Sequence, residues 1–412
     1  MNADGLLLTG ARLADGEVVD VLLAEGRIAA VGTPANAGVD RLDLSGYLLL
    51  PAPAEPHAHL DKALSAALVP NPDGDLSGAI EAWLRHSPTM THADIVARAT
   101  EAVMLSLANG ATAIRSHVDV HSGVGLRCLA ALLAVRDAVA ARVDLQLVAL
   151  PAPQLTGPAG AEDRALLREA LRMGADALGA CPYLDADPEL CHRLCLELAA
   201  EFEVPVDLHT DETIDERVLT LPYFAELVAG TGFPYGATAS HCVSLGVQPP
   251  TVAAKVAEQV AAAGVAVVCL PQTNLYLQAR DQPSAPPRGL TALSALLAAG
   301  ATVAGGGDNV RDPFNQVGRG DPLETASLLV AAGHLSPDRA YQAVSAGARA
   351  AMGLPEVRVA AGFPAELLAI RADSVAEAIA GATADRVVVH RGQVVSRTTV
   401  RREFPVLPGG GG

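Results

Sequence analysis

The sequence predicts an α/β fold: a (β/α)8 barrel of the TIM type, with a small composite β domain formed by both ends of the chain. Three observations lead to this prediction. The middle of the chain alternates eight short apolar runs with longer helical patterns. Both ends instead carry short apolar runs separated by turn signals. No segment matches a Gly-rich dinucleotide-binding fingerprint, so a doubly wound sheet is the second choice.

The composite β domain is predicted over residues 1–50 and 357–412. Turn signals at Asp15-Gly16 and Glu25-Gly26 divide the first part into short runs, and Arg391-Gly392 marks a turn in the second. Short apolar runs joined by tight turns are typical of antiparallel strands. The predicted strands lie at 6–8, 18–23, 27–31, 366–370, 386–390 and 393–400.

The barrel is predicted over residues 51–356. We interpret the apolar run 47–51 as the beginning of its first strand, which ends near His57 and His59. Helical patterns separate the strands that follow, as a parallel barrel requires. The other strands are expected at 113–120, 145–151, 177–182, 206–210, 237–242, 265–270 and 302–306, and helices at 93–108, 126–141, 163–173, 216–230 and 251–263.

Composition and charge narrow the class of function. The 412 residues include 29 basic and 46 acidic side chains, which give a formal net charge of −17. Such a charge argues against nucleic acid or an anionic membrane as a partner and favours a soluble enzyme of small molecules. No apolar run of membrane-spanning length occurs, and the N-terminus lacks the basic start of a signal peptide. We therefore expect a cytoplasmic protein, and leave open whether it forms a homo-oligomer.

The six cysteines are spread along the chain, as expected for reduced and mostly buried thiols. Cys191 and Cys195 enclose His192, which gives this segment the look of a metal-binding tract. The surrounding residues 188–201 have the pattern of an amphipathic helix. Core packing is therefore the preferred interpretation of these cysteines.

Histidines and carboxylates fall at the predicted strand ends, where barrel enzymes keep their reactive groups. His57 and His59 are two apart and would project to the same side of the first strand. His209 ends the fifth strand, and Asp308 follows the eighth. A nitrogen-rich set of this kind suits one Zn²⁺ or Fe²⁺ ion better than Mg²⁺ or Ca²⁺. Such an ion lowers the pKa of water enough for attack on carbon at neutral pH.

Two more side chains are candidates for the chemistry itself. Glu212, three residues after His209, is placed to carry a proton to a ring or leaving group. His241 ends the sixth strand and could stabilise charge at the attacked carbon. A rival metal set, His117, Asp119 and His121, alternates along the second strand. We prefer to place His117 in the pocket wall and the other two outside the metal site, because a metal cage draws ligands from several strands.

These residues occur in segments that resemble the amidohydrolase superfamily and, within it, the bacterial cytosine deaminase-like branch. The resemblance implies that His57, His59, His209 and Asp308 bind one metal ion. It also implies that Asp308 accepts a proton from the attacking water, that Glu212 shuttles a proton to a ring nitrogen, and that His241 orients the attacking oxygen. No lysine ends the fourth strand, so the second metal of some relatives is not expected. The matching segments are 55–61, 115–120, 144–149, 207–212, 239–241 and 308–314.

The chain departs from the cytosine enzymes at the positions that hold the pyrimidine. Ala152 stands where the branch has a glutamine, with Gln154 two residues later. Asn309 and Phe314 replace an aspartate and a tryptophan. Because loss of a hydrogen-bonding group usually costs much of the affinity for a substrate, cytosine itself is expected to react poorly. Gln272 is a further candidate for the pocket.

The predicted activity is therefore hydrolysis of a C–N bond by a mononuclear metal enzyme. The most favoured reaction is deamination of a cytosine-like or other cyclic amidine heterocycle, with release of ammonia. A first alternative is hydrolysis of a cyclic amide, or removal of an N-alkylamine substituent, by the same site. A second alternative is a barrel that binds a metal or ligand without catalysis, although a closed structural metal site would need neither Glu212 nor His241.

Overall fold

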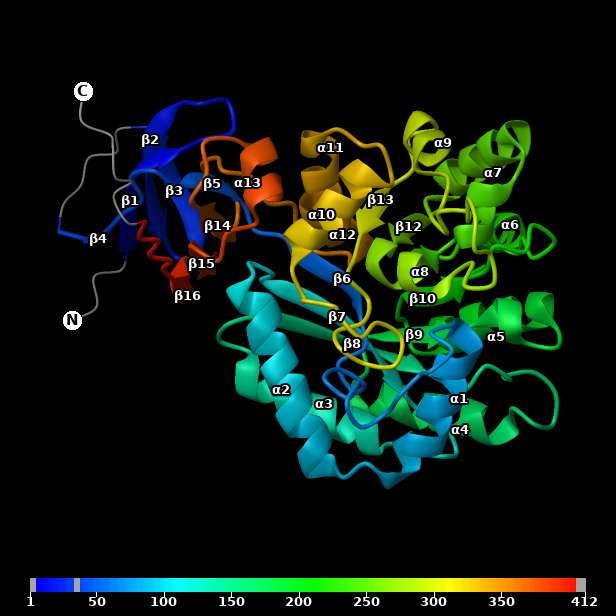
Figure 1. Cartoon of the computed structure of the whole chain (residues 1–412). Helices are drawn as coiled ribbons and strands as arrows, with labels where there is room; N and C mark the ends of the chain where they lie inside the picture. The colour runs from blue at the N-terminus through cyan, green and yellow to red at the C-terminus, as the bar shows by residue number, and fades with distance from the viewer. Residues whose placement is uncertain (1–4, 33–37, 405–412) are drawn as a thin grey trace.

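The computed structural model describes residues 5–32 and 38–404 and contains two separate β-sheets (Figure 1). One sheet is parallel and is surrounded by helices. The other is assembled from both ends of the chain and lies beside the barrel. This architecture confirms the predicted TIM-type barrel with an additional terminal sheet, and it excludes a doubly wound sheet. Residues 1–4, 33–37 and 405–412 of the predicted composite domain lie outside the described part, and the predicted boundaries of that domain stay a prediction.

The barrel sheet has eight parallel strands in sequence order, from β6 to β13. A parallel bridge between Ala58 and Asp308 joins the last segment to the first, and Asp308 N donates to His57 O at 3.0 Å. This closure brings Asp308 beside the first barrel strand. The strands are β6 (Ala54–Ala58), β7 (Ala113–Asp119), β8 (Asp144–Leu150), β9 (Ala177–Ala180), β10 (Val206–Thr210), β11 (Ala237–His241), β12 (Ala266–Cys269) and β13 (Val303–Gly305).

The first barrel strand corrects one prediction from the sequence. The apolar run 47–51 was expected to lead directly to the two histidines. Its residues instead form β5 (Leu48–Pro51), which pairs with the terminal strands, and the barrel begins only at Ala54. An apolar run does not reveal which sheet buries it. Here both faces of β5 are covered, because Leu48 and Leu50 pack into the barrel core and Leu49 packs into the core of the terminal sheet.

The terminal sheet is mostly antiparallel and joins the two chain ends through β5, which pairs with β14. It has its own apolar core, which includes Leu8, Val21 and Ile28. The buried Arg386 fixes it to the barrel by donating to both oxygens of Asp321, at 2.9 Å each. Its strands are β1 (Gly5–Arg12), β2 (Val18–Ala24), β3 (Arg27–Gly32), β4 (Asp40–Asp43), β5, β14 (Leu367–Ile370), β15 (Arg386–His390) and β16 (Gln393–Thr398).

Helices cover the outside of the barrel, and most of those predicted begin within two residues of the expected position. The exception is α6, which starts at Leu221 and not at 216. The Asp211 carboxylate accepts from the backbone N–H groups of Thr220 and Leu221 and thereby fixes where this helix begins. None of the described helices combines the length and apolarity needed to cross a membrane. The helices are α1 (Leu76–His86), α2 (His92–Ala108), α3 (Arg127–Val139), α4 (Ala161–Met173), α5 (Pro188–Glu201), α6 (Leu221–Thr231), α7 (Pro250–Ala263), α8 (Pro271–Leu277), α9 (Leu293–Ala298), α10 (Pro322–Ala331), α11 (Pro337–Gln342), α12 (Ala348–Ala351) and α13 (Val375–Gly381).

Candidate active site

The predicted metal ligands meet at the carboxyl end of the barrel. His57 belongs to β6, His59 follows it, His209 belongs to β10, and Asp308 follows β13. The His59 and His209 Nε2 atoms are 3.2 Å apart. Asp308 Oδ1 lies 3.4 Å from His59 Nε2 and 3.8 Å from His57 Nε2. Three parts of the barrel thus contribute donor atoms to one small region.

The chemistry of these donors fits a divalent metal ion. All four side chains are buried, and neither His57 Nε2 nor Asp308 Oδ1 has a hydrogen-bond partner among the described residues. Burial lowers the pKa of His57, His59 and His209 well below the ordinary value, so these rings are neutral and have lone pairs to offer. Burial, with further carboxylates nearby, raises the pKa of Asp308. A cation among the four side chains would offset that cost.

A chain of hydrogen bonds fixes which nitrogen of His57 faces the site. The Ser240 hydroxyl donates to Asp207 Oδ1 at 2.8 Å, so its oxygen accepts from His57 Nδ1 at 2.9 Å. His57 Nε2 is therefore unprotonated and faces Asp308 as a ligand atom. Arg115 completes the support by donating to Asp207 Oδ2 at 3.0 Å. Sequence patterns do not predict this support, because Ser240, Asp207 and Arg115 lie on three different strands.

A buried carboxylate holds the loop that carries Asp308. Both oxygens of Glu55 accept from Gly307 N, at 3.0 and 2.9 Å, and Glu55 Oε1 accepts from His57 N at 3.2 Å. A Cβ atom added at Gly306 would lie 2.7 Å from Glu55 Oε1. Gly306 and Gly307, the two residues before Asp308, therefore make room for Glu55.

The backbone is strained where the reactive side chains emerge. His241 and Asp308 have φ angles of 72° and 63°, and Asp211, beside Glu212, has 49°. Residues with a side chain rarely adopt this left-handed region, and such conformations cluster at functional sites. The strain turns the chain sharply at the strand ends, so the side chains at these positions project into the barrel mouth.

Glu212 and His241 form a second polar group beside the metal-type donors. Asn274 donates to Glu212 Oε1 at 3.3 Å and to His241 Nδ1 at 3.1 Å. Because His241 Nδ1 accepts this bond and burial lowers the His241 pKa to about 3, the neutral ring has its proton on Nε2. Burial raises the Glu212 pKa to about 8, and the Tyr183 hydroxyl lies 3.4 Å from its Oε2. Glu212 can therefore hold a proton at neutral pH.

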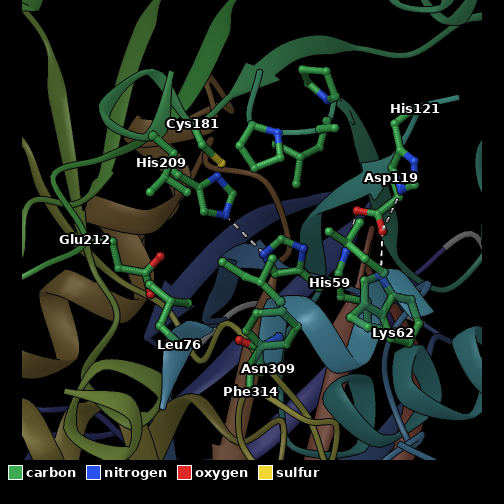
Figure 2. Close-up of a pocket in the computed structure, with 18 of the residues that line it drawn as sticks. His59, Lys62, Leu76, Asp119, His121, Cys181, His209, Glu212, Asn309 and Phe314 are labelled. Carbon is green, nitrogen blue, oxygen red and sulfur yellow. Dashed lines mark hydrogen bonds and ion pairs between the residues drawn. The ribbon is translucent and has the colours of Figure 1, made fainter. Parts of the chain in front are cut away.

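One pocket contains both groups, and Figure 2 shows its arrangement. His59 and His209 face one another at the centre of the view, and Glu212 lies on one side of them. Lys62, Asp119 and His121 lie on the other side. Apolar side chains of α1, of the last residue of β8 and of the segment after it form the walls: Leu76, Ile80, Leu84, Leu150, Pro151 and Pro153.

The residues predicted to bind substrate divide into two sets. Ala152, Asn309 and Phe314 line the pocket. His117, Gln154 and Gln272 do not line it. His117 packs behind His57, with ring centroids 4.0 Å apart, and lies 3.5 Å from Asp207. The Gln154 amide donates to Thr156 and Asp185, and the Gln272 amide lies 2.6 Å from the Thr325 hydroxyl.

The rival metal set does not converge. Asp119 and His121 line the pocket, whereas His117 does not line it and lies 3.5 Å from Asp207. Asp119 is bonded instead to Lys62 and to Trp83. Sequence reasoning missed Lys62 and Trp83 as pocket residues. The available signals were a lysine directly after the His-x-His segment and a tryptophan that is the only one in the chain.

A family model described as the amidohydrolase family matches residues 40–396. The chain therefore belongs to the amidohydrolase family. It is a metal-dependent hydrolase of carbon–nitrogen bonds, as its sequence predicted, and the alternative of a non-catalytic barrel is set aside. The sequence resemblance to deaminase-type members of this family is likewise confirmed.

Particular relatives add detail to this assignment. Pterin deaminase of Rhizobium rhizogenes is 33% identical over 403 residues, which cover 96% of this chain and 90% of the relative. The crystal structure of 5-methylcytosine deaminase from Klebsiella pneumoniae matches with a TM-score of 0.88 at 28% identity, over 97% of this chain and 99% of that one. N-isopropylammelide isopropylaminohydrolase from Burkholderia multivorans matches with a TM-score of 0.83 at 30% identity, over 96% and 99%.

Proposed function

We propose that this chain deaminates an amino-substituted nitrogen heterocycle of the cyclic amidine type, with water as co-substrate and ammonia as product. The observation that carries the proposal is the pairing of two groups in one pocket. Glu212, a carboxyl group that retains a proton, lies beside His241, which has a free N–H donor, and both adjoin the donors His59, His209 and Asp308. Relatives that are named deaminases of ring compounds support the same reaction.

The reaction replaces a ring C–NH₂ group by C=O, and each protein group has a defined part in it. Asp308 accepts a proton from the attacking water. Glu212 donates a proton to the ring nitrogen next to the attacked carbon, which makes that carbon more electrophilic. His241 donates its Nε2–H to the oxygen that adds. The leaving amine then departs as ammonia after taking a proton from these carriers.

We propose that His57, His59, His209 and Asp308 hold one divalent ion, Zn²⁺ or Fe²⁺. When bound, such an ion supplies the Lewis acidity that makes water reactive at neutral pH. Three imidazoles and one carboxylate favour these borderline ions over Ca²⁺ or Mg²⁺. The count of one rests on Ala180-Cys181-Pro182, which end the fourth barrel strand without a lysine.

The test combines metal analysis with an amine-release assay on the purified protein. Amino-pyrimidines, amino-pteridines, amino-triazines and their N-alkyl derivatives are supplied in parallel, and the released amine is identified. Ammonia release that disappears after metal removal and returns with Zn²⁺ or Fe²⁺ supports the proposal. Release of an alkylamine with no ammonia from any ring would favour the alternative hydrolysis. Release of neither by the metal-loaded protein would refute both.

Three further properties stay predictions beside this function. We propose a cytoplasmic location, because the six cysteines are free thiols, as is usual in a reducing compartment. The composite domain is proposed to extend over 1–50 and 357–412, with the barrel over 51–356. Whether the protein forms a homo-oligomer is left to size measurements in solution.

A further inference from the structure

The proposed reaction leaves one end of the pocket without a role. Opposite Glu212, the pocket is lined by Lys62, Trp83, Asp119 and His121 (Figure 2). We call these four residues the distal cluster. All four residues are buried, and each exposes less than a tenth of its surface. Charged groups are costly to bury, so their presence in a pocket with apolar walls calls for an explanation.

An ion pair forms the centre of the distal cluster. Lys62 Nζ donates to Asp119 Oδ1 at 2.5 Å, and Trp83 Nε1 donates to Asp119 Oδ2 at 2.6 Å. The nearest other carboxylate oxygen, Asp61 Oδ1, is 3.7 Å from Lys62 Nζ and forms no hydrogen bond. Lys62 has three N–H groups, so it retains donors that Asp119 does not use. Asp119 retains lone pairs on both oxygens.

His121 adds a further donor to this cluster. Its Nδ1 accepts from Gly123 N at 3.1 Å, so Nε2 carries the ring N–H. His121 Nε2 is buried and has no hydrogen-bond partner in the described part of the chain, and the nearest oxygen of Asp119 is 3.9 Å away. A buried donor without a partner, on a residue that lines the pocket, is a group that a ligand can satisfy.

From this geometry we infer that the distal cluster is a specificity site for the lactam edge of the substrate ring. The inference rests on the proposed function and names the substrate class of the same pocket: a ring amine that also has an N–H next to a C=O. Lys62 Nζ and His121 Nε2 donate to the ring carbonyl oxygen, and Asp119 accepts from the ring N–H. The ring C=O can accept from the two donors, and the ring N–H can donate to the one acceptor. A ring without the oxo group lacks this matching edge.

Charge balance supports a neutral ligand edge. Lys62 is paired with Asp119, and Asp61 contributes a second carboxylate nearby, so the cluster has no excess of positive charge to bind a phosphate or a carboxylate. Trp83 adds an indole ring with Lys62 Nζ 5.3 Å from its centre. The indole holds Asp119 in place through its N–H and borders the pocket with a flat apolar surface.

The test compares two substrates that differ only in the oxo group. Isocytosine and 2-aminopyrimidine form one pair, and 2-amino-4-oxopteridine and 2-aminopteridine form a larger pair. The metal-loaded wild-type protein should prefer the oxo member of a pair by about 10²-fold or more in kcat/KM, since a site built to hydrogen-bond a substrate rejects the analogue that lacks the group. The double variant Lys62→Met/Asp119→Asn removes both charges together, so neither is left buried alone. It should reduce the preference to less than about tenfold.

A matched control removes an ion pair that lies outside the pocket. Arg136 and Asp176 are 3.0 Å apart at the barrel exterior, and Arg136→Met/Asp176→Asn should leave the oxo preference unchanged. Should the Lys62 and Asp119 variant lose its metal or its fold, His121→Leu serves in its place. It replaces the imidazole by an apolar side chain, and it should lower the preference by about tenfold, the worth of one hydrogen bond.

A binding measurement separates failure of this inference from failure of the proposed function. Trp83 is the only tryptophan, so fluorescence of the protein reports directly on the distal cluster. Oxo rings should change this fluorescence at lower concentration than their deoxo partners, whether or not any amine is released. An oxo preference that is unchanged in the variants, or absent in the wild type, would overturn the distal site. Tight oxo-specific binding without turnover of any ring would instead refute the proposed function and retain the site.

Discussion

At the scale of single residues, the site depends on groups that are buried or strained at a cost in free energy. Asp308 is a buried carboxyl group on a strained backbone, and Glu55 is a second buried carboxylate that fixes its loop. Burial raises the Glu55 pKa to about 8, and the bonds from Gly307 and His57 work against that shift. Such states persist only because several neighbours determine them together.

Glu212→Gln separates proton transfer from metal binding. The amide occupies the same space but cannot donate a carboxyl proton, so kcat should fall by about 10²–10⁴, the usual contribution of a positioned acid–base group. Metal content, measured by elemental analysis, should stay that of the wild type. Loss of metal would show that Glu212 is itself a ligand.

Asp308→Asn should abolish turnover even in a preparation that retains metal.

Gly306→Ala tests the space that Glu55 occupies. The added methyl group would lie 2.7 Å from Glu55 Oε1 and 2.9 Å from Leu270 Cδ2, so Glu55 and the Asp308 loop must move. We expect a loss of stability of about 1–3 kcal/mol, typical of overpacking, together with reduced metal occupancy. Gly381→Ala is the control, because no described atom outside the adjoining backbone of its own helix α13 lies within 4 Å of the added methyl group. Equal metal occupancy in the two variants would contradict the role assigned to Glu55.

Ala152, Asn309 and Phe314 should make cytosine a poor substrate. All three line the pocket, and each replaces a residue type that the cytosine enzymes use to hold the pyrimidine. The measurement is kcat/KM for cytosine beside other ring amines. Cytosine as the best substrate, at about 10⁵ M⁻¹s⁻¹ or more, would reach the range of evolved enzymes and contradict this prediction.

At the scale of elements, α1 and α5 show what patterns along the chain do and do not disclose. Helix α1 has Leu76, Ile80 and Leu84 on one face, and these side chains line the pocket. Spacing by four residues is equally typical of a core-facing helix, so the pattern alone does not mark a binding wall. Helix α5 was predicted correctly, and Cys191, His192 and Cys195 are fully buried in it.

His192 of α5 should make stability depend on pH. Burial lowers its pKa from 6.5 to about 4. Between these values the unfolded chain binds a proton and the folded chain does not, so stability falls as the pH decreases from 6.5 to 4. The loss attributable to this ring is about 3 kcal/mol, from 1.36 kcal/mol per pKa unit. Urea unfolding of His192→Leu should therefore show a smaller loss between pH 7 and pH 4.5 than the wild type. Parallel losses in both proteins would contradict the prediction.

At the scale of the whole molecule, the candidate metal site unites distant parts of the chain. His57, His209 and Asp308 come from β6, β10 and the segment after β13, and the bridge between Ala58 and Asp308 closes the barrel at the same place. His57 and Asp308 therefore contribute side chains to the candidate metal site and backbone groups to barrel closure. The terminal sheet is fixed to the barrel elsewhere, through Arg386 and Asp321.

Metal removal should destabilise the barrel. A ligand that binds only the folded state stabilises it by about 2.7 kcal/mol at a concentration one hundred times its Kd. Treatment with a chelator should therefore lower Tm, and added Zn²⁺ or Fe²⁺ should restore it. His209→Ala should show the low Tm with or without added metal. If chelation lowered the Tm of this variant as much as that of the wild type, the metal would bind elsewhere.

The sequence alone determined the barrel, the terminal sheet and the positions of the reactive residues along the chain. Strand periodicity and strand-end histidines are local features, and the carboxyl ends of parallel strands must meet at one face. These rules were sufficient to place His57, His59, His209, Glu212, His241 and Asp308 together. They also predicted the reaction class that the family assignment confirms.

Tertiary structure alone decided which sheet each apolar run joins and which polar groups face one another. The run 47–51 joins the terminal sheet, because one of its faces packs into the barrel core and the other into the core of the terminal sheet. The side chains of Gln154 and Gln272 bond to partners outside the pocket. Lys62, Trp83 and Asp119, in contrast, contact one another inside it. Lys62 and Asp119 are 57 positions apart, and their contact depends on the register of neighbouring strands and on a helix packed over them. A contact between residues so far apart in the sequence produces no periodic pattern from which it could be predicted.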